Sequence, residues 1–390
     1  MKKRILFVDD EPNVLDGLQR MLRTMRSEWE MEFAVSGQNA LEILCEKTFD
    51  VIVTDMRMPG MDGCQLLDRV KNIHPEIVRI ILSGHSDKNM ILSSVGLTHQ
   101  FLSKPCDAET LKSTIASACA MRELLEDEYL IKIISKIESL PSLPSLYKEV
   151  VDEANSQDGS LARVGEIISK DVGMSAKLLQ LVNSSFFGLS TKVSGIMRAV
   201  NLLGLETIKS LILSIKIFSQ FDHPGMTSLS SLWDHSISTA MIARSMATQR
   251  DLTQNQIDEA FMAGLLHDVG KLILLDKLPE KRQEISNILG SNVCQLWEAE
   301  QKVLGTTHAP VGAYLMGIWG LSESLFEAIA FHHCPGKCSN NSFGTLTIVH
   351  LANSIEHCDR DKESTKRLDL GYLEKLGISE RLNGKLHNGV

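Results

Sequence analysis

The sequence predicts two domains of different fold class: an α/β domain with a doubly wound, five-stranded parallel sheet, and then an all-α helical domain. At 390 residues the chain is too long for one compact core. Over residues 1–120 short apolar runs alternate with segments of helical period, which is typical of βα units on a parallel sheet. From residue 145 to residue 355 the strand pattern is absent and apolar residues recur at spacings of three and four.

The predicted strands are five short apolar runs in the first domain. They span residues 5–8, 31–35, 51–54, 77–82 and 100–103. A helical pattern then runs from residue 107 to about residue 139. It ends where Pro141 and Pro144 rule out a continuing helix. We therefore expect a first domain over 1–120, a helical linker over 121–139, a helical domain over 140–358 and a charged tail over 359–390. The helix that starts at residue 107 could form the interface of a homodimer.

Composition narrows the class of protein. With 43% hydrophobic and 23% charged residues the chain resembles an ordinary globular protein, and its net charge of -9 argues against a nucleic-acid-binding output. No run approaches the roughly 20 apolar residues of a membrane-spanning helix, and the apolar run after the basic start is too short for a signal peptide. The eight cysteines contain no CxxC pair, so we expect reduced thiols and a cytoplasmic protein.

Polar side chains follow the predicted strands at the ends where a parallel sheet binds its ligands. These residues are Asp9, Asp10 and Glu11 after the first strand, Asp55 after the third, Ser83 after the fourth and Lys104 after the fifth. Because the carboxyl ends of parallel strands share one edge, these groups should converge. Clustered carboxylates repel one another, and Mg2+ is a hard cation that would neutralise them. The alternative is that the acidic residues only cap the following helix.

The sequence HDVGK at residues 267–271 stands out in the helical domain. It follows an apolar helical stretch, and an adjacent histidine and aspartate can bind one metal ion and bridge to a second. The histidines that join this pattern are His235, His267, His308, His332 and His333. Together with Asp268 they suit Zn, Fe, Mn or Ni, and Lys271 could contact a phosphate. His308 should open a helix, because threonines precede it and Pro310 follows. The alternative is that each histidine is an ordinary surface or core residue.

Asp9-Asp10, the run over residues 54–63, Ser83 and Lys104-Pro105 resemble the receiver domain of response regulators. The resemblance covers residues 1–120 and implies a flavodoxin-like fold with Asp55 as phosphoacceptor. It implies that Asp10, Asp55 and the backbone carbonyl of Arg57 hold Mg2+, with Asp9 assisting.

The same resemblance gives roles to three further residues. Ser83 would hydrogen-bond the phosphoryl oxygens, Lys104 would pair with them, and Phe101 would be the switch aromatic that responds to phosphorylation. The implied partner is a sensor histidine kinase or a phosphotransfer protein.

Residues 133–355 resemble the HDOD output domain, a relative of the HD and HD-GYP metal-dependent phosphohydrolases. The motifs that carry the resemblance lie at residues 140–144, 171–184, 201–204, 265–270, 304–313 and 328–333. It implies a divalent transition metal at the histidines and Asp268. Two positions depart from the hydrolases: Cys334-Pro335-Gly336 replaces their Gly-Tyr-Pro signature, and Asn353 stands where a late aspartate is expected.

Three functions follow in order of preference. The first is a phosphorelay switch in which phosphorylation of Asp55 controls a non-catalytic HDOD domain that binds a protein or nucleotide partner. The second is a phosphorylation-gated, metal-dependent phosphodiesterase or phosphohydrolase. The third, a DNA-binding transcription factor, is disfavoured by the acidic charge and by the absence of a basic recognition helix.

Overall fold

The computed structural model describes residues 2–84, 97–122, 124–125, 127–138, 140–142, 144–156, 159–183, 192–205, 207–208, 219–220, 226–291, 294–340, 342–360 and 368–378. The chain divides into two compact units. The first comprises Met1–Ile168, Gly173–Gln220 and Tyr314–Leu321, and the second comprises Ser169–Val172, Phe221–Ala313 and Ser322–Val390.

The first unit contains the predicted parallel sheet, with its strands in the order β2-β1-β3-β4-β5. The strands are β1 (Lys3–Val8), β2 (Trp29–Ala34), β3 (Val51–Asp55), β4 (Val78–Ser83) and β5 (Gln100–Ser103). All four strand pairs are parallel, so the carboxyl ends share one edge of the sheet. The chain reverses its direction of winding between β1 and β3, which is where a doubly wound sheet binds its ligand. The predicted fold class is confirmed.

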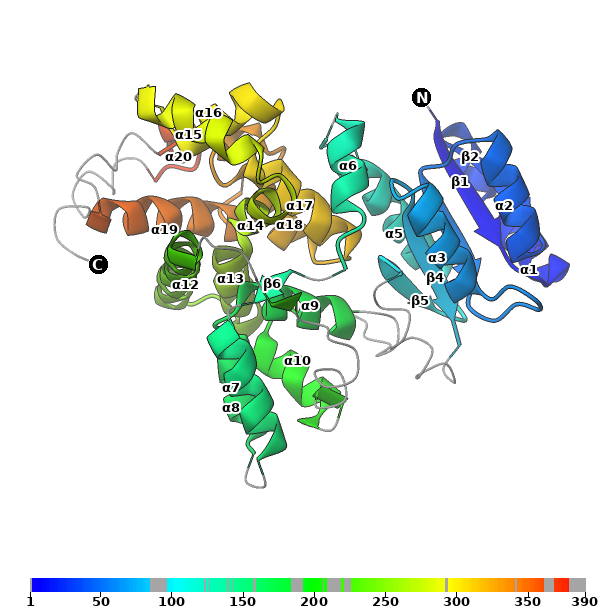
Figure 1. Ribbon diagram of the computed structural model, residues 1–390, viewed down its shortest axis with the longest axis horizontal. Coiled ribbons are helices and arrows are strands. Elements are labelled where there is room, and N and C mark those ends of the chain that lie inside the picture. The colour runs from blue at the N-terminus through cyan, green and yellow to red at the C-terminus, as the bar shows by residue number, and fades with distance from the viewer. Residues whose placement is uncertain are drawn as a thin grey trace. The chain divides into compact units, whose positions relative to one another are not determined.

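Helices cover both faces of this sheet (Figure 1). They are α1 (Pro12–Met21), α2 (Gly37–Glu46), α3 (Gly63–Ile73) and α5 (Ala108–Arg122), with the short 3-10 helix η1 (Arg23–Ser27). Local sequence sets where they begin. The hydroxyl of Ser36 caps α2, and Asp62 and Gln65 form a capping box at the start of α3. The strands bury apolar side chains such as Leu6, Ile52 and Ile81 beneath these helices.

The prediction of one unbroken helix from residue 107 to residue 139 is wrong. Helix α5 ends at Arg122, and a separate helix, α6 (Glu128–Ile134), follows. The carboxylate of Asp127 accepts hydrogen bonds from the backbone N–H groups of Tyr129 and Leu130. An aspartate in that position starts a new helix, which the apolar spacing alone did not reveal.

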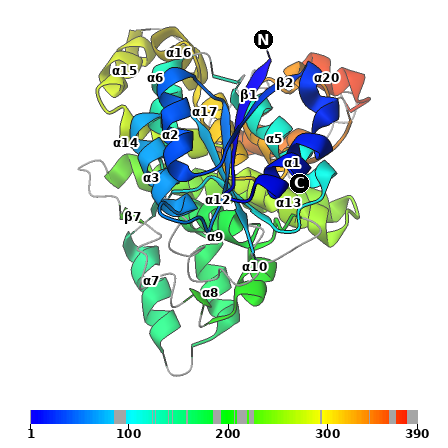
Figure 2. The ribbon, with the colours of Figure 1, turned by 90° about the vertical axis from the view of Figure 1, so that its right-hand side faces the viewer.

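The rest of the first unit is mostly helical. It contains α7 (Pro144–Asn155), α8 (Leu161–Ile168), α9 (Val172–Val182) and α10 (Ile196–Leu203). Helix α8 packs against α7 and α10, and Figure 2 shows α7 and α8 side by side. The expectation that no strand follows residue 145 needs one correction, because β6 (Pro141–Ser142) pairs in parallel with β7 (Ser219–Gln220).

A buried polar network joins β4 to the end of α6. The guanidinium of Arg79, 1% exposed, donates to the carbonyls of Leu97 and Ser135 at 2.7 and 2.8 Å. The ring of His99 accepts from the backbone N–H of Arg79 at Nδ1, 3.1 Å away, and its Nε2 lies 3.1 Å from the Ser135 carbonyl. These two contacts fit a neutral ring with its proton on Nε2.

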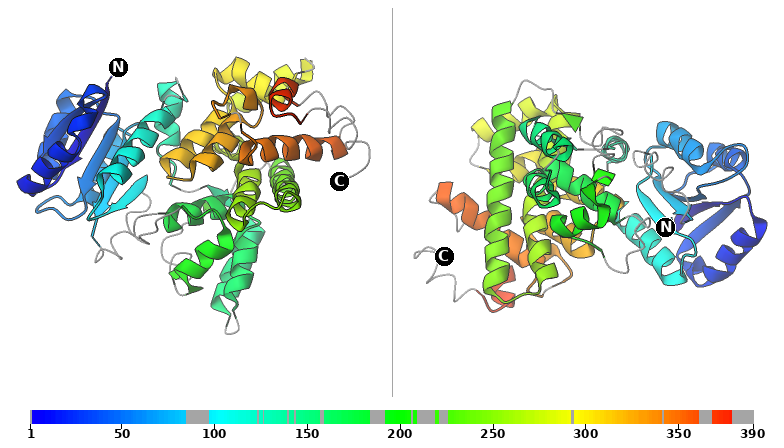
Figure 3. Two further views of the ribbon diagram at one scale, coloured as in Figure 1. Left: turned by 180° about the vertical axis from the view of Figure 1, so that it is seen from behind. Right: turned by 90° about the horizontal axis from the view of Figure 1, so that it is seen from below.

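The second unit is helical. Its elements are α12 (Met226–Gln249), α13 (Gln254–Leu266), α14 (Val269–Lys277), α15 (Lys281–Ser291), α16 (Leu296–Leu304), α17 (His308–Ile318), α18 (Glu323–Phe331), η3 (Pro335–Lys337), α19 (Thr345–Arg360) and α20 (Leu370–Lys375). The last residues of α17 cluster with the first unit. Helices α12, α13 and α19 pack on one another, α18 packs on α13 and α19, and α15 packs on α16 (Figure 3). Among the described residues, no helix combines the length and apolarity needed to cross a membrane.

The predicted tail is partly structured. Helix α19 continues to Arg360, and in α20 the side chains of Tyr372 and Leu373 are buried against Leu351 of α19. Residues 361–367 and 379–390 lie outside the described residues. The helical domain therefore includes apolar contacts beyond the expected boundary at residue 358.

We expect the first unit to lose stability as the pH decreases, because His99 is buried in its neutral form. Burial, and then the charge of Arg79, holds the pKa of His99 well below its ordinary value of 6.5. A depressed folded-state pKa contributes stability that is complete above the unfolded pKa of about 6.5 and is lost as the pH falls. His99→Asn should be less stable than the wild type at pH 7.5. Below pH 6.5 the gap should narrow by up to ~1.4 kcal/mol per pH unit.

Urea denaturation of both proteins between pH 7.5 and pH 5 measures this gap. A free-energy difference that stays constant over that range would contradict a neutral, buried His99.

Candidate functional site

The carboxyl edge of the sheet brings together three of the predicted receiver residues. The ammonium of Lys104, after β5, donates to Asp9 Oδ2 at 2.8 Å and contacts Asp55 Oδ1. The other oxygen of Asp55 accepts from the backbone N–H of Arg57 at 2.9 Å. Asp9 is 2% exposed and Asp55 is 9% exposed, so both carboxylates are nearly buried. One cation thus already bridges carboxylates from two strands.

The remaining predicted residues lie around this group. Asp10 follows Asp9 and is partly exposed, whereas Ser83 is buried at the end of β4. Phe101 is buried in the core of the sheet. Glu11 is exposed and precedes α1, with its backbone N–H donating to Asp9 Oδ1 at 3.0 Å, so its side chain does not join the cluster.

Electrostatics favour a charged lysine at this edge. Burial lowers the pKa of Lys104, but hydrogen bonds to Asp55 and Asp9 outweigh it and raise that pKa above its ordinary value. The oxygen donors of Asp9 and Asp55 lie within reach of one cation, and hard carboxylate oxygens are what Mg2+ prefers. The residues present therefore fit the implied magnesium ion.

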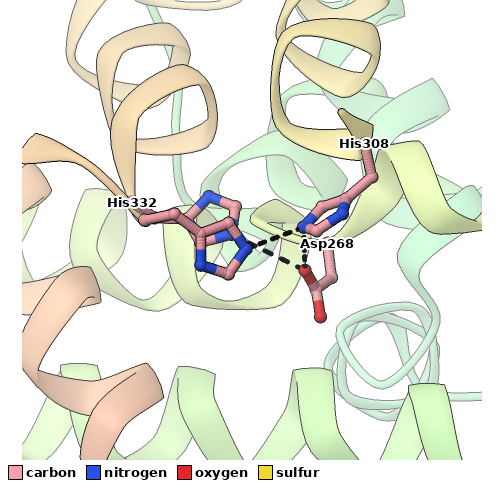
Figure 4. A group of neighbouring side chains, drawn as sticks. Asp268, His308 and His332 are labelled. Atoms are coloured by element: carbon pink, nitrogen blue, oxygen red, sulfur yellow. Dashed lines mark hydrogen bonds and ion pairs between the residues drawn. The ribbon is translucent and has the colours of Figure 1, made fainter. Parts of the chain in front are cut away.

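In the second unit, five histidines gather around the buried carboxylate of Asp268. Its Oδ2 lies 3.3 Å from Nε2 of both His235 and His267. Its Oδ1 lies 3.2 Å from Nε2 of His308 and 3.7 Å from Nε2 of His332. Figure 4 shows the rings of His308 and His332 directed at Asp268. Nε2 of the fifth, His333, lies 2.9 Å from Nε2 of His308. The two oxygens of one aspartate thus face two separate groups of imidazoles.

Four of these rings are oriented by an acceptor at Nδ1. Nδ1 of His235 lies 2.6 Å from Glu356 Oε2, and Nδ1 of His308 lies 2.6 Å from Glu300 Oε2. Nδ1 of His267 and Nδ1 of His332 face the carbonyls of Gly264 and Ile329, at 2.7 and 2.9 Å. An acceptor there requires the proton on Nδ1, and a neutral ring then turns the lone pair of Nε2 inward.

This arrangement requires positive charge at its centre. Neutral rings would point their lone pairs at an anion and at each other, as at the 3.2 Å contact between Nε2 of His235 and Nε2 of His267. Oδ1 of Asp268 and Nε2 of His332 are buried and make no hydrogen bond within the described part of the chain. Two ligands held ~2.1 Å from one metal ion stand about 3 Å apart, which is the spacing seen here. The donor set therefore fits a pair of divalent transition metal ions bridged by Asp268.

The pKa values divide the histidines into two kinds. Burial lowers the pKa of His235 and His308, but their carboxylate partners outweigh it and raise both above the ordinary value. Burial, followed by neighbouring histidines, holds the pKa of His332 and His333 well below it. Burial opposes the charge of Asp268, yet His267 and Lys271 hold its pKa well below the usual range. Asp268 is therefore an anion at neutral pH.

Close helix crossings at glycine bring these side chains together. A Cβ at Gly270 would stand 1.8 Å from the backbone oxygen of His308, so α14 meets the start of α17 with no room for a side chain. A Cβ at Gly264 would stand 2.7 Å from Cα of Ala240, where α13 crosses α12. The first crossing sets Asp268 beside His308, and the second sets His267 near His235.

The sequence prediction missed three neighbours of the cluster. Glu300 and Glu356 are the carboxylates that orient His308 and His235, and His357 lies close enough to share a cation with His235 and Glu356. Asn353, the expected place of a late aspartate, is buried on α19 one turn before Glu356. The local sequence of α19 carries no signal that distinguishes Glu356 from a surface glutamate. Lys271, predicted to contact phosphate, pairs with Asp268 here.

Two cavities reach the cluster. One, of about 470 Å³, is bordered by His235, Lys271, Glu300 and His357 and extends along α14, α15 and α16. The other, of about 280 Å³, is bordered by His332, His333 and Asn353. A small molecule could therefore approach the buried donors.

Comparison with known families shows to which family the chain belongs. The HDOD domain model matches residues 140–335, which is 196 of the 390 residues, and the response regulator receiver domain model matches residues 5–116. The chain belongs to the HDOD family. Because a response regulator receiver domain precedes the HDOD domain, the chain has the domain composition of a response regulator.

Individual relatives are similar to parts of this chain. An uncharacterized protein of Treponema pallidum (strain Nichols) is 28% identical over 224 residues, covering 57% of this chain and 43% of the relative. The hydrogenase transcriptional regulatory protein HoxA of Cupriavidus necator is 34% identical over 125 residues, or 32% of this chain and 25% of HoxA. The chain thus spans less than half the length of these curated relatives.

A solved structure shares the fold. The MmoQ response regulator from Methylococcus capsulatus str. Bath has a TM-score of 0.50 and 21% identity, and the alignment covers 64% of this chain and 98% of MmoQ. At that identity the likeness concerns the fold alone.

The crossing at Gly270 gives a stability prediction. Gly270→Ala should lower the free energy of unfolding by about 2–3 kcal/mol, because the added methyl group forces α14 away from α17. Gly290→Ala in α15 is the matched control, since a Cβ there meets nothing within 4 Å. It should leave stability unchanged or raise it by up to ~1 kcal/mol. Chemical denaturation measures both, and equal stability of Gly270→Ala and wild type would refute the close crossing.

Proposed function

We propose that this response regulator accepts a phosphoryl group on Asp55 from a sensor histidine kinase or a phosphotransfer protein. An oxygen of Asp55 bonds to phosphorus while the phosphorus–nitrogen bond of the donor phosphohistidine breaks. The electron pair of that bond stays on the leaving imidazole, which takes up a proton. The observation that supports this role most is the Asp55 carboxylate held at the end of β3 between the Arg57 N–H and the Lys104 ammonium.

The neighbouring residues prepare this transfer. Asp9, Asp10, Asp55 and the backbone carbonyl of Arg57 would hold Mg2+, which would neutralise the phosphoryl oxygens. Lys104 now pairs with Asp9 and Asp55, so it is in place to follow the negative charge when Asp55 is modified. Ser83 would donate its hydroxyl to a phosphoryl oxygen, and Phe101 would change its packing in response.

We further propose that the HDOD domain holds divalent transition metal ions at two adjacent positions. His235, His267 and Asp268 form one, and His308, His332, His333 and Asp268 form the other. The support is the convergence of Nε2 atoms on Asp268, whose buried Oδ1 makes no hydrogen bond among the described residues. In the leading version of this proposal the domain binds a partner or ligand without turnover, and phosphorylation of Asp55 controls that binding.

A second candidate, hydrolysis of a phosphate ester, is favoured by a specific set of contacts. The histidines and Asp268 would hold the metal ions, which would supply Lewis-acid chemistry for activating water and for stabilising phosphoryl charge. Lys271 stands beside the cluster and lines the larger cavity, so it could neutralise a substrate phosphate. Against turnover, Glu300 and Glu356 are each engaged with the Nδ1 of a histidine, and the Gly-Tyr-Pro signature is absent.

Asp55→Asn should abolish phosphorylation of the receiver. Incubation with radiolabelled acetyl phosphate and Mg2+ should label the wild type and leave this variant unlabelled, because an amide cannot form the acyl phosphate. Asp16→Asn, which changes an exposed aspartate of α1, is the control and should label normally. Label that persists in Asp55→Asn would place the acceptor elsewhere.

Metal analysis tests the second proposal. Plasma mass spectrometry of the purified chain should find about two transition metal ions per chain, a number that His308→Ala reduces. Glu356→Gln should weaken metal retention ~10–100-fold, because the carboxylate that orients His235 is lost. The partly exposed His74→Ala is the control and should retain both ions.

The outcomes separate the candidates. A metal-free wild type that cannot be loaded with zinc or manganese would contradict the metal proposal. Hydrolysis of a phosphodiester that is lost in His267→Ala would select the hydrolase, and bound metal without hydrolysis would select the binding domain.

A further inference from the structure

The larger cavity beside the histidine cluster has polar and apolar residues at separate places in its lining. Along α14 it is bordered by Lys271, Leu274, Leu275 and Leu278. Spacings of three, four and seven place these residues on one face of the helix. Seven residues of helix extend about 10 Å, so this face runs ~10 Å away from the Asp268 end of α14. On this face of α14 the polar residue, Lys271, lies at the cluster, and the residues beyond it are leucines.

Two further helices turn apolar faces to the same space. Ile285 and Leu289 border it from α15, and Leu296 and Leu304 border it from α16. Over these three helices the lining is chiefly leucine, while the nearby hydroxyls belong to Ser231 and Ser286. Among the described lining residues the aromatic rings are those of His235 and His357, both at the cluster. The lining therefore offers a nucleobase little stacking and few hydrogen bonds, whereas it suits an apolar chain.

The charge of the lining favours an anion. Lys271, Lys281 and Arg282 border the cavity, while the one carboxylate among its described lining residues, Glu300, is engaged with the Nδ1 of His308. Lys281 also pairs with Glu284, 2.9 Å away, outside the cavity. Lys271 stands at the cluster, where metal ions would also attract an anion. A volume of about 470 Å³ falls in the range of small-molecule sites.

We propose that this cavity binds an organic phosphate monoester with an unbranched apolar body. The phosphate lies at Lys271 and the histidine cluster, and the apolar body extends along the leucine face of α14 between α15 and α16. This placement of the phosphate rests on the proposed metal pair. The ligand is a free amphiphile, and neither a cyclic dinucleotide nor a membrane surface fits this apolar lining as well.

Calorimetric titration of the full, metal-loaded chain tests the proposal with octyl phosphate below its micellar concentration. Octyl phosphate should bind at least about tenfold more tightly than inorganic phosphate, since the chain buries several methylene groups. It should also bind at least about tenfold more tightly than 1-octanol, because only the ester carries the anion. Equal affinity for octyl phosphate and inorganic phosphate would overturn the proposal, as would tighter binding of cyclic di-GMP or binding only to phosphatidic acid vesicles.

A matched pair of variants locates the site. Leu289 borders the cavity and is 36% exposed, and Leu202 of α10 is 39% exposed and does not border it. Because both side chains are exposed, glutamate at either position should be tolerated by the fold. Leu289→Glu should weaken octyl phosphate binding at least about tenfold through repulsion and lost apolar contact, and Leu202→Glu should not. Equal affinity in the two variants would overturn the placement.

Metal content of the same samples separates this proposal from the preceding one. Bound metal without preference for octyl phosphate would overturn the cavity proposal and leave the metal proposal standing. Octyl phosphate binding that depends on Leu289 in a chain that cannot be loaded with metal would support the apolar site and contradict the metal pair.

Discussion

The second unit is organised around one buried carboxylate and the imidazoles directed at it, a set of groups that favours positive charge at its centre. Asp268 is 1% exposed, and an anion in such a place is costly unless positive charge surrounds it. Two rings approach each of its oxygens, and each of those rings is held from behind by a carbonyl or a carboxylate. These residues lie in or next to five helices, α12, α13, α14, α17 and α18, so the packing of the unit and the charge balance of its centre depend on each other.

The same constraint operates at the carboxyl edge of the sheet on a smaller scale. There a side chain of the protein, the ammonium of Lys104 between Asp9 and Asp55, offsets one of the two carboxylate charges. The negative charge that remains suits a bound Mg2+, which would also neutralise the charge that phosphorylation adds. Within the described part of the chain, the ammonium that contacts Asp268 is that of Lys271, beside five histidines and several carboxylates, which suits a resident cation.

The sequence predicted the receiver site well because parallel strands impose the geometry. Once β1, β3 and β5 were identified, Asp9, Asp55 and Lys104 had to meet at one edge. The break between α5 and α6 was missed because an aspartate at position 127 is compatible with the polar face of one continuous helix as well as with the start of a new one. Only its hydrogen bonds distinguish the two. Glu356 was missed because it lies 121 residues from His235, and nothing in the local sequence of α19 distinguishes it from a surface glutamate.

The sequence by itself determined the two fold classes, the order of the domains and the residue types of both clusters, because strand alternation, helical period and the HDVGK motif are local patterns. The tertiary structure decided which nitrogen of each histidine faces Asp268 and which carboxylates hold the rings. It also decided that a leucine-lined cavity opens beside Lys271. These features depend on where helices cross, as at Gly264 and Gly270, and a crossing is set by contacts between residues far apart in the chain.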